Sequence, residues 1–410
     1  MDVASSNLVS RSIARSSPPI DAAIRGPDVL VAVETFAGAL TRGERMLILM
    51  RRRRLLSSAA CAILIGACSA APAATVPSPA GTVPAAPASE TPSPETSAAP
   101  EPPQAEALAW ELLEADGPAA REDHTWTLDD AGEVAYLFGG RDGTTVFGDT
   151  WAFDLADEGW TRLEPAAAPP ARFGHEAVWV EGIGLVVFAG QADPLTFFAD
   201  LWAYDPAADE WSQLPATGAA PVARYGSCAA IGPGGRLWIS HGFTQEQSRF
   251  SDTRAYDFAS GTWTDETPAG SRPVERCLHG CWWTDAGELA LYAGQTTGVT
   301  ALDDRWVLRD GAWSRVEGAL PPPRNLYARA RLGSGTVVFG GLGLEETYLD
   351  DLWLLPDDDA GALALDPAGG PPPGRAGAEL IIDATRSRGL LFGGRGGDGA
   401  LDDLWILRGL

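Results

Sequence analysis

Residues 172–211 read RFGHEAVWVEGIGLVVFAGQADPLTFFADLWAYDPAADEW, and this stretch contains every marker of the repeat that decides the fold. It opens with Arg172 and runs through an apolar stretch to the doublet Ala189-Gly190. Asp200-Leu-Trp202 and a second tryptophan, Trp211, follow. The same order of markers occurs six times, at a period of about 50 residues. The fold is therefore expected to repeat one structural unit.

The six copies agree in the order and spacing of their markers. The opening arginines are Arg121, Arg172, Arg224, Arg276, Arg324 and Arg375. The second residues of the doublets are Gly140, Gly190, Gly242, Gly294, Gly341 and Gly394. Asp-x-Trp is complete in five copies and reads Asp252-Thr-Arg254 in the third. Runs between the markers, such as Gly184-Leu-Val-Val-Phe188, are short and rich in β-branched and aromatic residues, which predicts strands and no helix.

This pattern resembles the kelch β-propeller family over residues 108–410. The resemblance implies an all-β fold, a six-bladed β-propeller of four-stranded antiparallel blades around a central channel. Three copies depart from it with Ala189, His241 and Ala293 at the first doublet position, and Ala362 replaces the second tryptophan of the fifth copy. Because a glycine allows close backbone approach and a large aromatic side chain supplies packing area between blades, we interpret the markers as structural.

The sixth copy stops before its outer strand and second tryptophan. Residues 108–113 stand before Arg121 as residues 159–163 stand before Arg172. We therefore expect an N-terminal strand around Trp110 to complete the last blade, which would remove the open edges of the ring.

The chain in front of the repeats is interpreted as a targeting signal. Residues 50–67 place Met50-Arg-Arg-Arg-Arg54 before an apolar run that is too short to span a bilayer and then before small residues, as in a signal peptide. Ile65-Gly66-Ala67-Cys68 resembles the lipobox of bacterial lipoproteins, which implies lipid attachment at Cys68. An ordinary secretory signal, cleaved near Ala70 or Ala74, is the alternative.

Two flanking segments complete the domain organisation. Residues 1–49 carry no pattern, so we expect translation to start at Met46 or Met50. Residues 68–107 are rich in Ala, Pro, Ser and Thr and read as an extended, lipid-anchored linker. The propeller, residues 108–410, is thus expected to be exported and anchored to the membrane, either in the periplasm or on the outer cell surface.

Composition argues against several classes of function. The formal net charge is −25, so nucleic acid is an unsuitable partner, because binding it depends on cations that neutralise phosphates. The chain has no lysine, which removes Schiff-base and phosphate-loop lysines from consideration. We expect no cofactor.

The positions of the four histidines argue against a catalytic group of residues. His124, His175 and His279 each stand three residues after a repeat arginine, which favours a structural role, whereas His241 interrupts a doublet and is the first candidate for function. Among kelch enzymes, the copper site of galactose oxidase-like proteins cannot be assembled from these residues. The Glu-x-x-x-Asp-x-x-x-His motif of the iron-dependent specifier proteins does not occur. We therefore expect no catalytic residue and no metal site.

The repeat arginines are expected to ring one end of the channel. They either form an anion-binding collar or pair with marker carboxylates such as Asp149 and Asp200. We favour the pairing, because a buried arginine without a counter-charge destabilises the fold. The residues after the doublets are less uniform, and specificity is expected where a repeated scaffold varies: they are Arg141, Gln191, Phe243, Gln295, Leu342 and Arg395. The predicted ligand-binding residues are Arg141, Gln191, His241, Gln295 and Arg395. The nearby Phe197, Phe198 and Phe250 either stack on a ligand or form loop cores.

Three cysteines lie in the repeat region. Cys277 and Cys281 are about 13 Å apart along one strand, too far for a mutual disulfide and too extended for one metal ion held with His279. Cys228 and Cys281 stand at nearly equal heights on neighbouring inner strands with opposite parity. They form a bridge between the third and fourth blades, or both turn outward.

These observations predict a membrane-anchored, monomeric scaffold that binds a protein or a glycan at the cell envelope and lacks catalysis. The alternative is an envelope enzyme acting on an anionic sugar, because exported sialic acid mutarotases, which are kelch proteins, need only Arg, Glu and His at the channel mouth. Two or more unpaired arginines beside a Glu or His in the channel would favour the enzyme.

Overall fold

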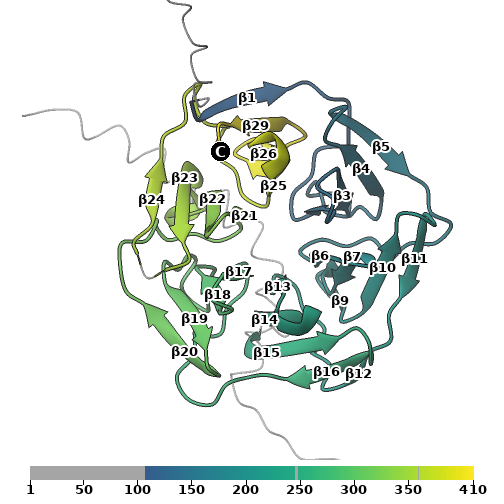
Figure 1. Ribbon diagram of the computed structural model, residues 1–410, viewed down its shortest axis with the longest axis vertical. Coiled ribbons are helices and arrows are strands. Elements are labelled where there is room, and N and C mark those ends of the chain that lie inside the picture. Colours follow the sequence, from purple (N-terminus) through teal and green to yellow (C-terminus); the bar gives the residue numbers. More distant parts are fainter. Residues whose placement is uncertain (1–106, 245–247, 359) are drawn as a thin grey trace, which may run out of the picture. The chain divides into compact units, whose positions relative to one another are not determined.

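The computed structural model describes residues 107–244, 248–358 and 360–410. They form a six-bladed β-propeller in which each blade is a four-stranded antiparallel sheet, so the predicted fold is confirmed (Figure 1). The described residues contain no α-helix, only the 3-10 turns η1 (Pro233–Gly235), η2 (Leu344–Glu346) and η3 (Ala384–Arg386). The predicted signal peptide, Cys68 and nearly all of the linker lie outside the described residues.

The blades follow one another along the chain. Blade 1 contains β2 (Thr125–Leu128), β3 (Val134–Phe138), β4 (Thr150–Asp154) and β5 (Gly159–Leu163). Blade 2 contains β6 (Glu176–Val180), β7 (Gly184–Phe188), β10 (Leu201–Asp205) and β11 (Glu210–Gln213). Blade 3 contains β13 (Cys228–Ile231), β14 (Leu237–Phe243), β15 (Arg249–Asp257) and β16 (Thr262–Asp265), with β12 (Thr217–Gly218) added in parallel at the outer edge.

The second half of the ring repeats this plan. Blade 4 contains β17 (Gly280–Trp283), β18 (Leu289–Tyr292), β19 (Arg305–Arg309) and β20 (Ala312–Val316). Blade 5 contains β21 (Ala328–Leu332), β22 (Gly335–Leu342), β23 (Tyr348–Pro356) and β24 (Leu363–Leu365). Blade 6 contains β25 (Glu379–Asp383), β26 (Arg388–Phe392), β29 (Leu404–Arg408) and β1 (Ala109–Leu113). Small hairpins, β8 (Gln191–Asp193) with β9 (Thr196–Phe197) and β27 (Arg395–Gly396) with β28 (Gly399–Ala400), extend two of the loops.

The N-terminal strand closes the ring as expected. Strand β1 lies beside β29 (Figure 1). The pairing of the two strands places Trp110 opposite Leu407. In blade 1 the second tryptophan, Trp160, lies opposite Phe153 on the corresponding strand. Because both partners stand four residues after the aspartate of Asp-x-Trp, Trp110 occupies the second-tryptophan position of blade 6.

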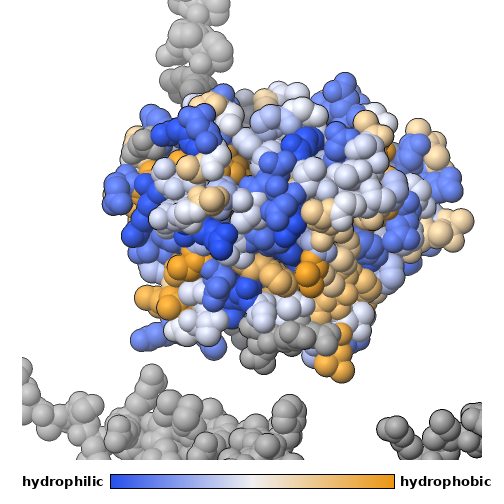
Figure 2. Space-filling model, turned by 90° about the horizontal axis from the view of Figure 1, so that it is seen from below, coloured by the Kyte–Doolittle hydropathy of each residue, from blue (hydrophilic) through white to orange (hydrophobic). Residues whose placement is uncertain are grey.

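The hydrophobic core consists of six clusters, one between each pair of neighbouring blades. The second tryptophan of a blade packs in the cluster shared with the preceding blade, as Trp211 does between blades 1 and 2 and Trp263 does between blades 2 and 3. In blade 5 the smaller Ala362 takes this place. Outside these clusters, hydrophilic residues are interspersed with small hydrophobic groups on the side seen in Figure 2.

The glycine doublets connect neighbouring blades. The N–H group of each second glycine donates to the carbonyl of the next repeat arginine at 2.8–2.9 Å, and Gly394 completes the circle to Arg121. A Cβ atom on Gly140 would lie 2.8 Å from that of His124, so no side chain fits there. The first doublet residue is left-handed in every blade, including Ala189, His241 and Ala293, with φ near +60°. The blades with substituted doublets therefore keep the same turn.

Blades 3 and 4 are also joined covalently. Cys228 and Cys281 form a disulfide with 5.6 Å between their Cα atoms, whereas Cys277 is a buried free thiol. The bridge lies within the cluster shared by the two blades, so the opposite parity of the two cysteines turns them toward each other. The two cysteines are 53 positions apart in the sequence, and a disulfide typically stabilises a fold by ~2–4 kcal/mol.

No helix in the described ranges is long and apolar enough to cross a membrane.

Candidate functional site

The six repeat arginines are used inside the fold. Each is buried, and Nη1 donates to one carboxylate oxygen of the aspartate in its own blade at 2.5–2.8 Å. Nη2 donates to the second oxygen at 2.7–3.1 Å. Nη1 also reaches the carbonyl of the first doublet residue, which explains why that residue must be left-handed. The repeat arginines are therefore not available as an anion-binding collar, and their predicted pairing with aspartates such as Asp149 and Asp200 is confirmed.

Hydrogen bonds keep the partner aspartates ionised. Burial alone would raise the pKa of Asp200, but hydrogen bonds from Arg172 and Trp202 outweigh it and hold that pKa below its ordinary value. In five blades the indole Nε1 of Asp-x-Trp donates to the aspartate at 2.7–2.8 Å. In blade 3, Arg254 Nε donates to Asp252 instead, at 3.2 Å. The third copy thus replaces one N–H donor by another.

Aromatic loop residues lie against these arginines. The guanidinium carbons of Arg121, Arg172 and Arg224 lie 4.1–4.3 Å from the ring centroids of Phe147, Phe198 and Phe250. Phe197 contacts Phe243, with 6.1 Å between the ring centroids. The structure therefore indicates that these phenylalanines form the cores of the loops and do not stack on a ligand.

The residues that follow the doublets form a ring on one face of the propeller. Each makes a β-bridge with the residue after its repeat arginine, as in the pairs Glu122 with Arg141 and Phe173 with Gln191. We call the surface formed by these residues and by the loops that carry the repeat arginines the loop face.

Arg141 and Arg395 come together over one acidic pair. Arg395 Nε donates to Glu122 Oε1 at 2.8 Å, and Arg141 lies 3.3 Å from the same oxygen and 2.9 Å from Asp123 Oδ2. Arg141 also stacks on Phe173 at 4.2 Å. Burial raises the pKa of Asp123 to about 6 although Arg141 opposes the shift. Both arginine side chains remain about one-third exposed, so they are accessible to a partner.

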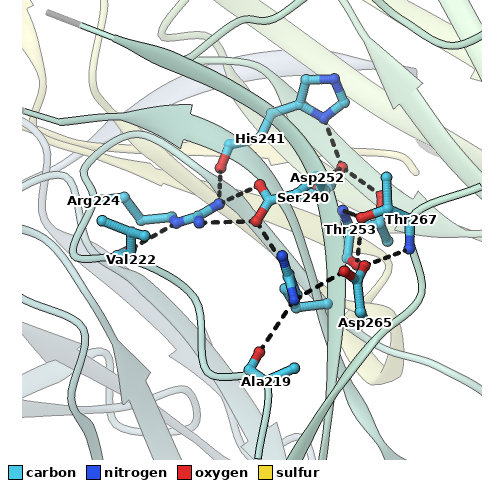
Figure 3. Close-up of polar contacts among 10 residues, drawn as sticks. Ala219, Val222, Arg224, Ser240, His241, Asp252, Thr253, Asp265 and Thr267 are labelled. Atoms are coloured by element: carbon cyan, nitrogen blue, oxygen red, sulfur yellow. Dashed lines mark hydrogen bonds and ion pairs between the residues drawn. The ribbon is translucent and has the colours of Figure 1, made fainter.

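The other three predicted ligand residues are placed differently. Gln191 and Gln295 are half-buried, and their amides donate to the Asp193 carbonyl at 2.8 Å and to Cys277 Sγ at 3.6 Å. His241 is fully buried, and its Nδ1 lies 2.6 Å from Ser240 Oγ (Figure 3). Burial lowers the pKa of His241 to about 3, so the ring is neutral. Its side chain lies inside the protein, away from the partly exposed side chains of Arg141 and Arg395.

A closed ring of backbone hydrogen bonds narrows the channel at the loop face. The backbone N–H group of the residue two places after each repeat arginine donates to the carbonyl of the equivalent residue in the preceding blade, at 2.7–3.1 Å. These hydrogen bonds form a closed circle through Asp123, Gly174, Gly226, Leu278, Leu326 and Gly377. These residues line a cavity of about 60 Å³. A much wider cavity, of about 490 Å³, lies at the other ends of the inner strands and reaches Leu128, Ile231 and Trp283.

Three charged residues line both cavities: Glu176, Arg329 and Glu379. Arg329 Nη2 lies 3.6 Å from Glu176 Oε2, which links blade 5 to blade 2. Burial raises the pKa of Glu176 to about 7 and that of Glu379 to about 8, although Arg329 opposes both shifts. Carboxyl groups that titrate near neutral pH are typical of functional sites.

Sequence reasoning missed these three residues. They stand four or five places after their repeat arginines, where the other copies have small, hydroxyl or apolar side chains such as Thr125, Ala229 and Cys281. A charge at an otherwise uncharged inner-strand position was the available signal. The described ranges contain no group of three or more His, Cys, Asp or Glu side chains arranged to hold a metal ion.

Comparisons with known proteins agree with the repeat pattern. Residues 104–294 match the family described as the KLHDC2/KLHL20/DRC7 Kelch-repeats domain. The chain is 25% identical to acyl-CoA-binding domain-containing protein 4 of Arabidopsis thaliana, over 68% of this chain and 44% of that protein. It is 26% identical to Adagio-like protein 1 of Oryza sativa subsp. japonica, over 72% of this chain and 50% of that protein.

A third relative is named for the same motif. The Rab9 effector protein with kelch motifs of Gallus gallus is 27% identical, over 47% of this chain and 53% of that protein. The chain thus spans about half the length of these curated relatives. The six repeats, their closure into a ring and these matches together place the chain in the kelch-repeat family.

Proposed function

We propose that this protein is an exported, lipid-anchored scaffold that binds a partner protein through its loop face. A kelch propeller is a scaffold suited to protein binding. The observation that carries the proposal is the distribution of exposed apolar residues. Of seven large hydrophobic side chains exposed in the described ranges, five lie in loops of the loop face: Leu195, Val222, Val274, Val299 and Leu344. Apolar groups beside polar and arginine side chains are typical of protein interfaces.

The polar residues of the loop face support the same role. Arg141 and Arg395 remain partly exposed beside Phe173, and arginine and aromatic side chains are enriched in binding hot spots. The repeat arginines are all engaged by aspartates, which disfavours an anion-binding collar and with it the envelope enzyme as first choice.

The first test uses charge substitutions on two faces. Leu195→Asp and Val299→Asp place a carboxylate in the proposed interface, and each is expected to weaken partner binding at least tenfold, about 1.4 kcal/mol. Leu363→Asp, on outer strand β24, is the matched control, because Leu363 is also exposed but lies on the rim. The measurement is quantitative capture from solubilised membranes, followed by an affinity titration of the captured protein.

A partner whose binding is abolished by Leu363→Asp and unaffected by the other two substitutions would move the interface to the rim. If the protein instead binds glycans on an array, and the two loop-face substitutions weaken that binding, the partner is a glycan and not a protein. The loop face would then still be the binding surface.

The anchor has its own test. Cys68→Ser removes the proposed acceptor thiol, so the protein should move from the membrane fraction to the soluble exported fraction and lose incorporation of labelled fatty acid. Cys61→Ser, within the predicted signal peptide, is the matched control and should change neither readout. Equal labelling of the Cys68→Ser protein and the unaltered protein would contradict lipidation at Cys68.

A further inference from the structure

The wide channel cavity has the dimensions of a small-molecule site. Its volume of about 490 Å³ lies within the range of ordinary ligand pockets. Inner strands from all six blades line it. Since the backbone ring closes the channel at the loop face, we infer that a ligand enters from the opposite end, beside Leu128, Ile231 and Trp283.

One carboxyl group in this cavity has no hydrogen bond or ion pair. Glu379 makes no side-chain hydrogen bond and has no cation within 4 Å among the residues that the structure describes, although the charge of Arg329 acts on it from farther away. Arg329 faces Glu176 instead, at 3.6 Å. With both glutamates ionised, this group of three carries one net negative charge.

The other charged groups around Glu379 are already compensated or neutral. Asp123 is paired with Arg141, and Arg331, at the wide end, is held by Asp357 at 2.5 Å. Burial lowers the pKa of the three channel histidines, so their rings are neutral; they are His124, His175 and His279. Burial raises the pKa of Tyr327, which therefore stays protonated. No neighbouring cation thus neutralises Glu379 fully.

The narrow extension of the cavity offers further polar contacts. His124 and His279 line it, both are almost fully buried, and neither ring nitrogen of either residue has a hydrogen-bond partner in the described chain. Buried polar groups are normally satisfied, so these four nitrogens point to a hydroxyl group or a water molecule in the occupied channel.

Partly buried apolar residues lie at the wide end of the cavity: Trp283, Leu128 and Ile231. Trp126 and Trp282 also border it, but their side chains pack into the clusters between blades. Indole faces attract organic cations, and the attraction grows when the cation loses water. Of the charged residues that line the cavity, Arg329 faces Glu176 and Arg331 is paired with Asp357, whereas Glu379 has no ion pair, so a cation suits the cavity better than an anion.

We propose that the wide channel cavity binds a small organic ammonium compound, whose charge lies against Glu379 and Glu176 and whose carbon atoms lie against Trp283 and Ile231. The strongly acidic composition of the protein, with a formal charge of −25, favours the approach of such a cation. This site is separate from the loop face.

Protons compete with the proposed ligand. The pKa values of about 7 for Glu176 and about 8 for Glu379 mean that these carboxyl groups are largely protonated below pH 7. A bound cation requires the ionised form, so affinity should rise with pH, by up to about tenfold per pH unit for each proton displaced, and level off above about pH 8.

The test is calorimetric titration of the full-length protein, in detergent where needed, with choline and butylammonium as cationic probes. Sodium glucuronate and glucose are the anionic and neutral probes. We expect a cationic probe to bind at pH 8.5, with affinity at least tenfold lower at pH 6, and neither of the other two probes to bind. Glu379→Gln should weaken cation binding at least tenfold, whereas Glu164→Gln, at an exposed surface position, should not.

The proposal fails if neither cationic probe binds, if glucuronate or glucose binds in their place, or if Glu379→Gln leaves the affinity unchanged. The pH series on the unaltered protein remains decisive if Glu379→Gln disturbs folding, because cation binding that does not change between pH 6 and 8.5 also overturns the proposal. Leu195→Asp should leave cation binding intact, so failure here is distinguishable from failure of the loop-face proposal.

Discussion

Replacing Arg172 by alanine is expected to lower the free energy of unfolding by ~3–5 kcal/mol, because it leaves the aspartate of a buried ion pair without its partner. Arg172 is completely buried and makes two hydrogen bonds to Asp200, besides those to the carbonyls of Ala189 and Pro170. The substitution removes all four bonds. Urea denaturation at neutral pH measures the change.

Two further variants test the cause. Arg172→Lys keeps the charge but cannot reproduce the two parallel bonds to Asp200, so it should remain clearly destabilised. Arg162→Ala breaks an ion pair with Glu164 in which both side chains are more than half exposed, and it should cost at most ~1 kcal/mol. If Arg172→Ala cost no more than Arg162→Ala, the buried pairs would not be what holds the loops of the blades.

The buried pair also predicts how stability responds to acid. Because the pKa of Asp200 is held below its ordinary value in the folded protein, the ionised carboxylate contributes stability above the pKa of the unfolded chain. That contribution is lost as the pH falls through the folded pKa. The difference in stability between the unaltered protein and Arg172→Ala should therefore shrink in acid.

Loss of the closing tryptophan should have a comparable effect. Trp110 is 4% exposed, lies opposite Leu407 and packs edge-on against Phe339 with 5.3 Å between the ring centroids. Replacing a buried tryptophan by alanine typically costs ~3–5 kcal/mol. Trp110→Ala should therefore melt well below the unaltered protein in calorimetry. A chain that begins at Pro118 lacks β1 altogether and should melt lower still, or aggregate, in comparison with one that begins at Gln104.

Leu112 provides a control on the same strand. Its side chain is 46% exposed, so Leu112→Ala removes little buried area and should change stability by less than ~1 kcal/mol. Equal melting of the chains that begin at Pro118 and Gln104 would mean that the ring does not depend on β1.

The repeat markers could be assigned from the sequence because they belong to one blade and recur at one spacing. Arg121 and Asp149 are 28 residues apart, and the other arginine–aspartate pairs have a separation of 27 or 28. A spacing that recurs six times predicts the same contact six times. The closing strand followed from the same regularity, since the last copy lacks what the residues before the first copy supply.

Departures from the repeat were harder to interpret, because a departure shows that a position differs and not where its side chain lies. His241 and Arg141 both stood out in the sequence. The structure buries the imidazole of His241, since the first doublet residue must turn its carbonyl toward the repeat arginine, and leaves the side chain of Arg141 partly exposed. The phenylalanines of the loops were likewise ambiguous until the guanidinium groups were seen to lie against Phe198 and Phe250.

The sequence by itself thus determined the fold class, the number of blades, the closure of the ring and the pairing of the repeat arginines. Only the tertiary structure showed that Glu176, Arg329 and Glu379 meet in the channel. These residues come from blades 2, 5 and 6, and their proximity depends on the diameter of the closed ring and on the height of each side chain along its inner strand. Neither quantity is contained in the spacing of a local repeat, because contacts across the channel join residues that are far apart in the chain and follow no common interval.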